Sequence, residues 1–263
     1  MLKNVIIPVD FSEVSLNAAR YAAAMLKKQE QTHVLLYSMF EDLDEAETTA
    51  EYLESLKKEF NEKGITSVET VKEHGDDFID SLDRLAFQKA ASLIVMGITG
   101  RSPLGQAFIG SHALKMAEKN VCPVLIIPPD AQFNEINNIA FTCDFKEVDA
   151  MPALFIKKML DTFKANLHII NVDSEHYISL NESYESCQKQ IKEMLNGYNP
   201  EFYFMRWHSF HEAINQFATD YHIDLILTIP KYHSMLSRIL GGSQTKKLVY
   251  HSTIPVLAVH QQL

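Results

Sequence analysis

The sequence predicts an α/β protein that consists of two tandem doubly wound domains, each with a five-stranded parallel sheet and about four helices. Two observations support this fold class. Short apolar, β-branched runs alternate with amphipathic stretches of helical period, the pattern of a parallel sheet built from strand–helix–strand units. The elements of the first half then recur in the second half, in the same order.

Five strands and four helices are expected in the first half. The strands are predicted at 4–9, 33–39, 67–72, 92–97 and 123–128, and the helices at 13–29, 46–63, 76–90 and 110–119. Ser12 is a suitable N-cap for the first helix, and Gly64 a suitable stop for the second. Because several of the strands are apolar throughout, helices are expected on both faces of the sheet.

The second half repeats the first half at a nearly constant offset. NVIIPVDFSE at 4–13 recurs as NIAFTCDFKE at 138–147, and IGSHALKMAEKNVCPVLIIP at 109–128 recurs as GGSQTKKLVYHSTIPVLAVH at 241–260. This offset indicates a tandem duplication, with domains at 1–130 and 131–263. The two halves join around 128–137, where two consecutive prolines close the first unit.

Composition excludes several classes of protein. A net charge of −10 disfavours binding to nucleic acid or to an anionic membrane, because both require a basic surface. No window reaches the roughly 18 apolar residues of a membrane span. The three cysteines form no CxxC pair, so reduced thiols in a cytoplasmic protein are expected, and neither a disulfide framework nor a zinc site.

A glycine-containing loop at 97–111, GITGRSPLGQAFIGS, joins the predicted fourth strand to the helix that follows it. Glycines let a backbone approach a polyphosphate closely, and the free N–H groups of a helix's first turn point toward an anion. Asp10 and Ser38 also lie at strand ends of this kind, where doubly wound sheets bind their ligands. The loop therefore predicts a nucleotide site.

With PVDFSE after the first strand and this loop after the fourth, the chain resembles the universal stress protein family in its tandem form. The resemblance covers nearly all 263 residues, and the first half matches the Gly-x2-Gly-x9-Gly-(Ser/Thr) spacing of the ATP-binding members. It implies a Rossmann-like, adenine nucleotide α-hydrolase-like fold.

The resemblance also implies a role for each matching residue. Asp10 would lie near the adenine and ribose, and the backbone of Ser38 would bond the adenine edge. The phosphates and ribose of ATP, with or without Mg²⁺, would be held by Gly97, Gly100, Gly110 and Ser111, assisted by the N–H of His112. Arg101 could reach the phosphates or could equally be a solvated loop residue.

Pairing of the two halves is a further implication of the resemblance. Members of the family commonly pair through the last strand, which here corresponds to 123–128 and 255–260. An intrachain pseudo-dimer is therefore expected, and a homodimer of the whole chain is left open.

The second half departs from the nucleotide-binding pattern. It keeps Asp144 and the pair Gly242–Ser243, but Ile229 and Tyr232 replace the first two glycines. Their loss removes the permissive backbone that a phosphate loop needs, and the tyrosine adds bulk. The second half is therefore expected to bind no ATP, and to be a degenerate partner or a site for another ligand.

Other conspicuous residues favour ordinary structural roles. His208 and His211 form an HxxH without a third ligand at metal spacing, which indicates surface or capping histidines. Met96, Met116, Phe108 and Phe217 are expected in the core.

Three functions are compatible with these features. The first is a regulatory, stress-response module that binds ATP or ADP with little or no turnover and has no catalytic residue that the sequence identifies. The chain lacks GxxxxGK(S/T), kinase signatures and a GxSxG elbow. The second is an ATP-hydrolysing or ATP-dependent enzyme of the adenine nucleotide α-hydrolase-like group, although PVDFSEVS stands where its SGGxDS or HxGH motif would be. The third is a nucleotide-free interaction scaffold.

Overall fold

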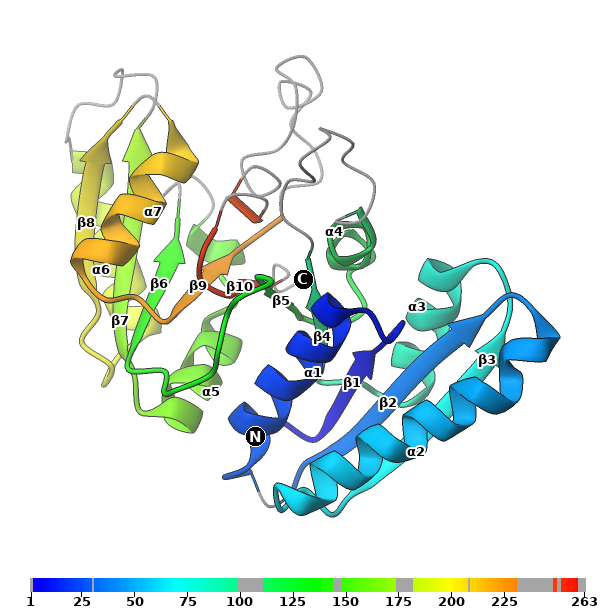
Figure 1. Ribbon diagram of the computed structural model, residues 1–263. Coiled ribbons are helices and arrows are strands. Elements are labelled where there is room, and N and C mark those ends of the chain that lie inside the picture. The colour runs from blue at the N-terminus through cyan, green and yellow to red at the C-terminus, as the bar shows by residue number, and fades with distance from the viewer. Residues whose placement is uncertain are drawn as a thin grey trace. The chain divides into compact units, whose positions relative to one another are not determined.

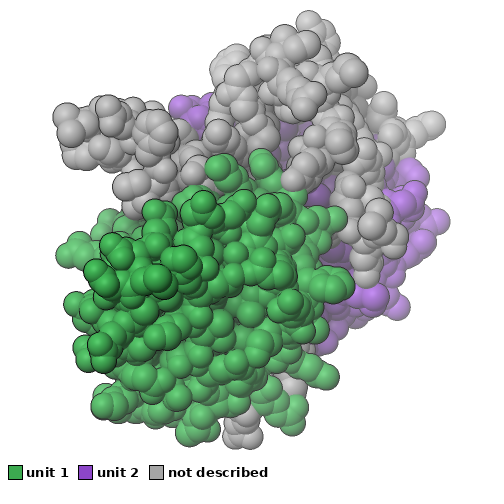
Figure 2. Space-filling model, turned by 90° about the vertical axis from the view of Figure 1, so that its right-hand side faces the viewer, with its two compact units in different colours: residues 1–134 green, residues 135–263 purple. Residues whose placement is uncertain are grey.

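The chain divides into two compact units, Met1–Asn134 and Glu135–Leu263, which are coloured separately in Figure 2. The computed structural model describes residues 2–29, 31–98, 111–143, 148–173, 182–207, 209–230, 248–249 and 252–259. Each unit contains a parallel sheet of five strands with helices packed on it, which confirms the predicted fold class.

Unit 1 has the strand order β3-β2-β1-β4-β5, and every neighbouring pair is parallel. Its strands are β1 (Asn4–Pro8), β2 (His33–Phe40), β3 (Val68–His74), β4 (Leu93–Gly97) and β5 (Val124–Ile127). Its helices are α1 (Glu13–Leu26), α2 (Ala46–Glu62), α3 (Phe78–Gln88) and α4 (Ser111–Glu118), with a short 3-10 turn η1 (Leu43–Glu45) before α2.

Helices cover both faces of this sheet, as the apolar strands predict. In Figure 1, α1 and α2 lie on one face and α3 and α4 on the other. The central strands between them are largely buried: Ile6 and Ile7 of β1 and Leu36 of β2 are 0% exposed, whereas the edge strand β3 is partly exposed.

The first two helices of unit 1 begin and end close to the predicted residues. Ser12 caps α1, because its Oγ accepts a hydrogen bond from the N–H of Ser15 at 3.3 Å. Gly64 follows α2 with a φ of +91°, a conformation that favours glycine. The first helix ends at Leu26 and not at residue 29, because 27–29 are polar residues without an apolar side chain to bury.

A carboxylate on β3 fastens α3 to the sheet. Glu73 accepts hydrogen bonds from the buried phenol of Tyr37 at 3.1 Å and from Ser81 of α3 at 3.1 Å. Arg84 of α3 pairs with the same carboxylate. The ring of Tyr37 also packs against Phe78, with centroids 6.2 Å apart.

The segment that follows β5 packs on α1. The side-chain amide of Asn17 donates to the carbonyls of Pro128 and Ala131 at 3.3 and 3.1 Å. Tyr21, one helical turn further on, meets Phe133 edge to face, with ring centroids 5.4 Å apart. Residues 128–133 are therefore part of unit 1.

Unit 2 has the strand order β10-β9-β6-β7-β8 and is also parallel throughout. Its strands are β6 (Asn138–Thr142), β7 (Asn166–Asp173), β8 (Glu201–Arg206), β9 (Leu225–Thr228) and β10 (Val256–Ala258). Its described helices are α5 (Ala153–Phe163), α6 (Glu182–Met194) and α7 (Phe210–Asp220), with a 3-10 turn η2 (Val148–Ala150).

Of the residues expected in the core, Met96, Met116 and Phe217 are buried. Phe108 lies outside the described residues. Among the helices in the described part of the chain, none combines the length and the apolar character needed to cross a membrane.

Candidate functional site

The candidate site lies at the carboxyl edge of the unit 1 sheet, at the point where successive strands are added on the opposite side of β1. From β1 the chain proceeds outward through β2 and β3, and then returns to place β4 on the other side of β1. Ligands of doubly wound sheets bind at such a switch point. Asp10 follows β1 and Gly97 ends β4, so the fold brings these two predicted site residues to the same edge.

Asp10 is exposed and supports the start of α1. Its Oδ1 accepts hydrogen bonds from the Ser12 N–H at 3.0 Å and from the Ser12 hydroxyl at 2.6 Å. Partial burial favours the neutral acid, but the hydrogen bonds from Ser12 and Ser15 outweigh it and hold the pKa of Asp10 below the usual aspartate value. The carboxylate is therefore a preorganised, ionised acceptor at the sheet edge.

Gly97 is required by the packing of α1. A Cβ added to Gly97 would lie 2.7 Å from both the carbonyl oxygen and Cγ1 of Val14, in the first turn of α1. The backbone of β4 can approach the helix this closely only without a side chain. This requirement is independent of any ligand, and the sequence pattern alone did not reveal it.

The backbone of Ser38 faces β3, not the end of β1. Val9 N–H donates to the carbonyl of Tyr37 and Gly75 N–H donates to the carbonyl of Phe40, so odd residues of β2 face β1 and even residues face β3. Because β1 ends at Pro8, the N–H and C=O of Met39 face the space beyond it. A ligand there would meet the backbone of Met39.

The start of α4 supplies the remaining predicted residues that the structure describes. Ser111 is the first residue of the helix and His112 the second, so both backbone N–H groups belong to the first turn, which has no intrahelical acceptor. The ring of His112 packs on Phe78 of α3, with centroids 5.2 Å apart. Its side chain is therefore engaged with α3. Gly100, Arg101 and Gly110 lie outside the described residues.

Phe11 is a feature of this edge that the sequence reasoning missed. It adopts a φ of +59°, unusual for a bulky residue, and its ring lies 5.1 Å from that of Tyr52 on α2. No local signal in the sequence marks a positive φ at a phenylalanine.

The corresponding edge of unit 2 has a different chemistry. The hydroxyls of Thr142 and Thr228 are 3.1 Å apart, and the amide of Asn171 donates to the carbonyl of Cys143 at 2.8 Å. Thr142, Asn171 and Thr228 are all buried, with at most 9% of their surface exposed. Among the described residues at this edge, these polar groups are therefore bonded to one another.

The helix that follows the first strand also starts further away in unit 2. In unit 1, β1 ends at Pro8 and α1 begins at Glu13, whereas β6 ends at Thr142 and α5 begins only at Ala153. Ile229 occupies the position of Gly97 in the repeat. Asp144, Tyr232, Gly242 and Ser243 lie outside the described residues.

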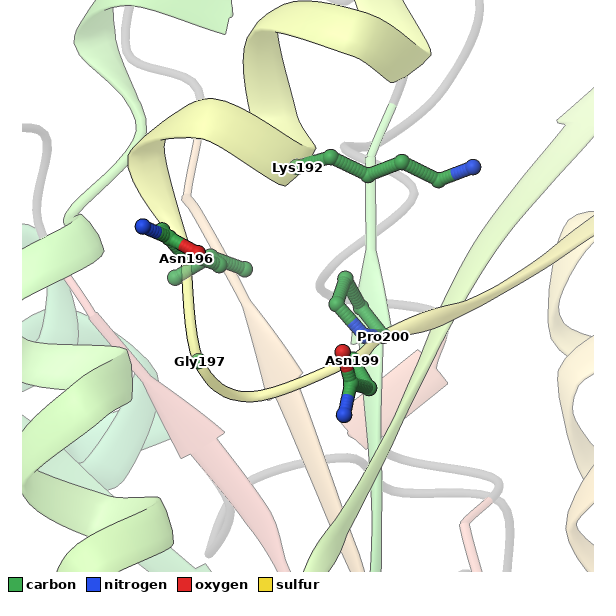
Figure 3. A pocket seen from close by; sticks show the side chains of 6 residues that line it. Lys192, Asn196, Gly197, Asn199 and Pro200 are labelled. Carbon is green, nitrogen blue, oxygen red and sulfur yellow. The ribbon is translucent and has the colours of Figure 1, made fainter.

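A groove of about 410 Å³ lies at the opposite, amino edge of the unit 2 sheet. Figure 3 shows it along the loop that leads from α6 to β8. It is lined by Lys192, Leu195, Asn196, Gly197, Asn199 and Pro200. Its place before the first residue of β8 separates it from the carboxyl edge, where a nucleotide is expected.

The described residues hold no group of three or more His, Cys, Asp or Glu side chains placed to bind a metal ion. His211 Nδ1 instead lies 2.9 Å from Ser209 Oγ. His208 lies outside the described residues.

The structure defines a class of α/β proteins with two doubly wound units in tandem. One of these units has an aspartate, a close-packed glycine and a helix start at its switch point. The model of the universal stress protein family matches residues 1–128 and 161–260. The chain belongs to the universal stress protein family.

Individual relatives match about half of the chain. Universal stress protein MJ0531 of Methanocaldococcus jannaschii is 30% identical over 141 residues, which cover 48% of this chain and 82% of that protein. Universal stress protein Sll1654 of Synechocystis is 27% identical over 139 residues, which cover 49% of this chain and 87% of that protein.

Solved structures resemble the whole chain. The crystal structure of a universal stress protein from Archaeoglobus fulgidus superposes with a TM-score of 0.77 at 19% identity and covers 98% of both chains. A protein of unknown function from Pseudomonas aeruginosa superposes with a TM-score of 0.69 at 16% identity, and the match covers 99% of this chain and 93% of that one. At these identities the similarity concerns the fold.

Proposed function

We propose that unit 1 is a regulatory module that binds one ATP or ADP per chain with little or no turnover. The observation that carries the proposal is the sheet edge itself. An ionised Asp10, the outward-facing backbone of Met39 and the N-terminus of α4 all lie at the carboxyl ends of neighbouring strands. These groups match the hydroxyls, the base edge and the phosphates of a nucleotide.

The base is proposed to bind along β2. Met39 offers an N–H donor and a C=O acceptor on the same side of the strand. Adenine offers a ring-nitrogen acceptor beside an amino donor, which complements this pair. We therefore assign the backbone role to Met39 and not to Ser38.

The sugar and phosphates are proposed to bind on either side of β1. The carboxylate of Asp10 can accept hydrogen bonds from ribose hydroxyls, a role that acidic residues fill at other doubly wound sheets. The phosphates are assigned to the loop residues Gly100 and Gly110 and to the N–H groups of Ser111 and His112. Arg101 and Mg²⁺ are proposed to balance phosphate charge.

Unit 2 is proposed to hold no ATP. Its edge is occupied by the hydrogen bonds of Thr142, Thr228 and Asn171, and Ile229 stands in place of the glycine. Pairing through residues 123–128 and 255–260, a homodimer and a cytoplasmic location stay predictions from the sequence.

The test begins with protein purified without added nucleotide. Denaturation followed by mass spectrometry should release ATP or ADP, and calorimetry on the emptied protein should give about one site per chain. Asp10→Asn should weaken binding. Asp144→Asn, the matching change in the second copy of the repeat, should leave binding unchanged. Failure to recover nucleotide, together with no heat of binding, would overturn the proposal.

Turnover measured on the same sample separates a module from an enzyme. ATP consumption at about 1 per second or faster is an ordinary enzyme rate and would favour the hydrolytic alternative.

A further inference from the structure

His168 on β7 is a buried histidine whose hydrogen-bonding capacity is only partly used. The residue is 7% exposed, and its Nε2 lies 3.4 Å from Asn138 Oδ1 on β6. Within the described part of the chain, Nδ1 has no hydrogen-bond partner. An unpaired nitrogen at a buried site is unusual, because burying a polar group without a partner is unfavourable.

Three aromatic rings surround this imidazole. Its centroid lies 5.7 Å from that of Tyr203 on β8, and 6.1 and 6.0 Å from those of Phe217 and Tyr221 at the end of α7. Phe217 and Tyr221 stack at 4.2 Å, and Tyr203 lies 4.8 Å from each of them. These three rings, the aromatic cluster, pack α7 against the sheet.

Glu201 is the nearest charged group. Its Oε2 lies 3.9 Å from His168 Nδ1 and accepts a hydrogen bond from the Tyr203 hydroxyl at 2.5 Å. The phenol of Tyr221, directly after α7, faces the imidazole. The neutral amide of Asn138 faces it from β6. Asp224 at the same edge is engaged by the N–H groups of Asn137 and Asn138.

The balance of these surroundings disfavours the charged imidazole. Burial lowers the pKa of His168 below the ordinary histidine value of 6.5, and the charge of Glu201 opposes this effect without cancelling it. The folded unit therefore takes up a proton less readily than the unfolded chain does.

Unit 1 shows that the fold does not require a histidine here. Leu35 pairs with Glu69 as His168 pairs with Glu201, so Leu35 is the counterpart of His168. Leu35 is 0% exposed.

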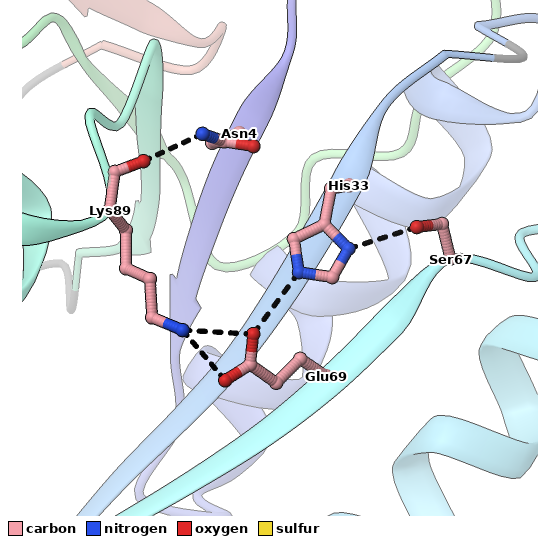
Figure 4. A network of polar contacts seen from close by, with 5 residues as sticks. All are labelled: Asn4, His33, Ser67, Glu69 and Lys89. Atoms are coloured by element: carbon pink, nitrogen blue, oxygen red, sulfur yellow. Dashed lines mark hydrogen bonds and ion pairs between the residues drawn. The ribbon is translucent and has the colours of Figure 1, made fainter.

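The counterpart of Glu201 in unit 1 is fully engaged. Figure 4 shows Glu69 held by Lys89 at 2.8 and 3.0 Å and by His33 Nε2 at 3.2 Å. The other ring nitrogen of His33 lies 2.9 Å from Ser67 Oγ. This histidine is partly exposed and both of its nitrogens have partners, so it is a matched control for His168.

We propose that His168 makes unit 2 acid-responsive, because proton uptake by its imidazole loosens the aromatic cluster and with it the packing of α7 on the sheet. The new N–H at Nδ1 needs an acceptor, and the nearby carboxylate oxygen, Glu201 Oε2, is 3.9 Å away and already accepts from the Tyr203 hydroxyl. Glu201 must therefore shift for a direct hydrogen bond to form. A charge inside the cluster also draws water toward Tyr221, which is 42% exposed. The proposal is independent of nucleotide binding by unit 1.

The direction of the effect follows from linkage. The unfolded chain takes up the proton as the pH falls through 6.5, whereas folded unit 2 takes it up only at lower pH. The stability of unit 2 therefore decreases as the pH falls below 6.5, and it levels off once the pH is below the pKa of the folded state. Each unit of lowering corresponds to about a tenfold change in the opening equilibrium.

Hydrogen–deuterium exchange on the full chain tests the proposal, after correction for the intrinsic pH dependence of exchange. Spectra are taken at about pH 7.5 and about pH 5.5, on either side of the range in which histidine titrates. Peptides from β8 and α7 should lose protection at the lower pH, by at most about tenfold, because a single histidine with an unfolded pKa of 6.5 can contribute no more than this over that range. Peptides from β3 and α3 of unit 1 should change far less.

Two variants and a control decide the outcome. His168→Leu, which installs the unit 1 residue, should abolish the acid-induced loss in β8 and α7, and His33→Leu should not affect it. Glu201→Gln retains the imidazole and should lower the pKa of His168 further, as measured by NMR titration. Equal acid-induced losses in wild type and His168→Leu would overturn the proposal, as would titration of His168 at or above 6.5.

Discussion

Replacing Gly97 by alanine is expected to destabilise unit 1 by about 1–3 kcal/mol, the usual cost of forcing extra volume into a packed site. The new Cβ would lie 2.7 Å from the carbonyl oxygen and from Cγ1 of Val14, and 3.1 Å from its carbonyl carbon. A rotamer change can relieve the contact with Cγ1. The contact with the oxygen can be relieved only by moving the backbone of α1 or β4.

Gly75→Ala is the matched control. A Cβ at Gly75 would lie 3.4 Å from Cε and 3.9 Å from Sδ of Met39, the flexible end of a side chain. Its backbone φ lies outside the range that favours glycine, so the substitution is expected to be neutral or to stabilise by up to about 1 kcal/mol through the unfolded state.

Urea denaturation followed by far-ultraviolet circular dichroism measures both variants, with hydrogen exchange in β4 and α1 to locate the change in unit 1. If Gly97→Ala is as stable as Gly75→Ala, the inferred close approach of α1 to β4 is wrong. The result also bears on binding experiments. A loss of nucleotide affinity in Gly97→Ala would reflect a displaced helix as much as a lost ligand contact, so Asp10→Asn is the cleaner probe.

Two further predictions concern unit 1. Burial, aided by the charge of Asp83, raises the pKa of the Cys122 thiol to about 12. Native protein at about pH 8 should therefore resist alkylation of Cys122 by iodoacetamide, whereas urea-denatured protein should react. Peptide mass spectrometry measures both reactions. Native labelling at the rate of a free thiol would contradict the buried placement. Glu73→Gln keeps the shape of the side chain but removes the charge that pairs with Arg84, and should lower the free energy of unfolding by about 1 kcal/mol in urea denaturation. An unchanged midpoint would show that this partly exposed ion pair contributes little.

The sequence predicted the sheets because their pattern is local and redundant. Apolar strands such as β1, caps such as Ser12 and stops such as Gly64 act within a few residues, and the duplication showed each pattern twice. Such local patterns can be predicted from the sequence because they do not depend on contacts with distant residues.

Features set by contacts between distant residues could not be predicted in this way. Whether Ser38 or Met39 faces the end of β1 depends on the register of β2 with β1, which neither strand specifies alone. The burial of His168 depends on rings contributed by β8 and α7. The requirement for glycine at Gly97 depends on the first turn of α1.

The packing of residues 128–133 on α1 has a practical consequence for dividing the chain. The first match to the family ends at residue 128, but a fragment cut there would lack the Ala131 carbonyl that Asn17 binds and the ring of Phe133 that covers Tyr21. Such a fragment would leave the Asn17 amide with only one of its two carbonyl partners and would uncover the ring of Tyr21 to solvent and to other copies of itself. A gene fragment intended to yield the first unit alone should therefore extend through Asn134.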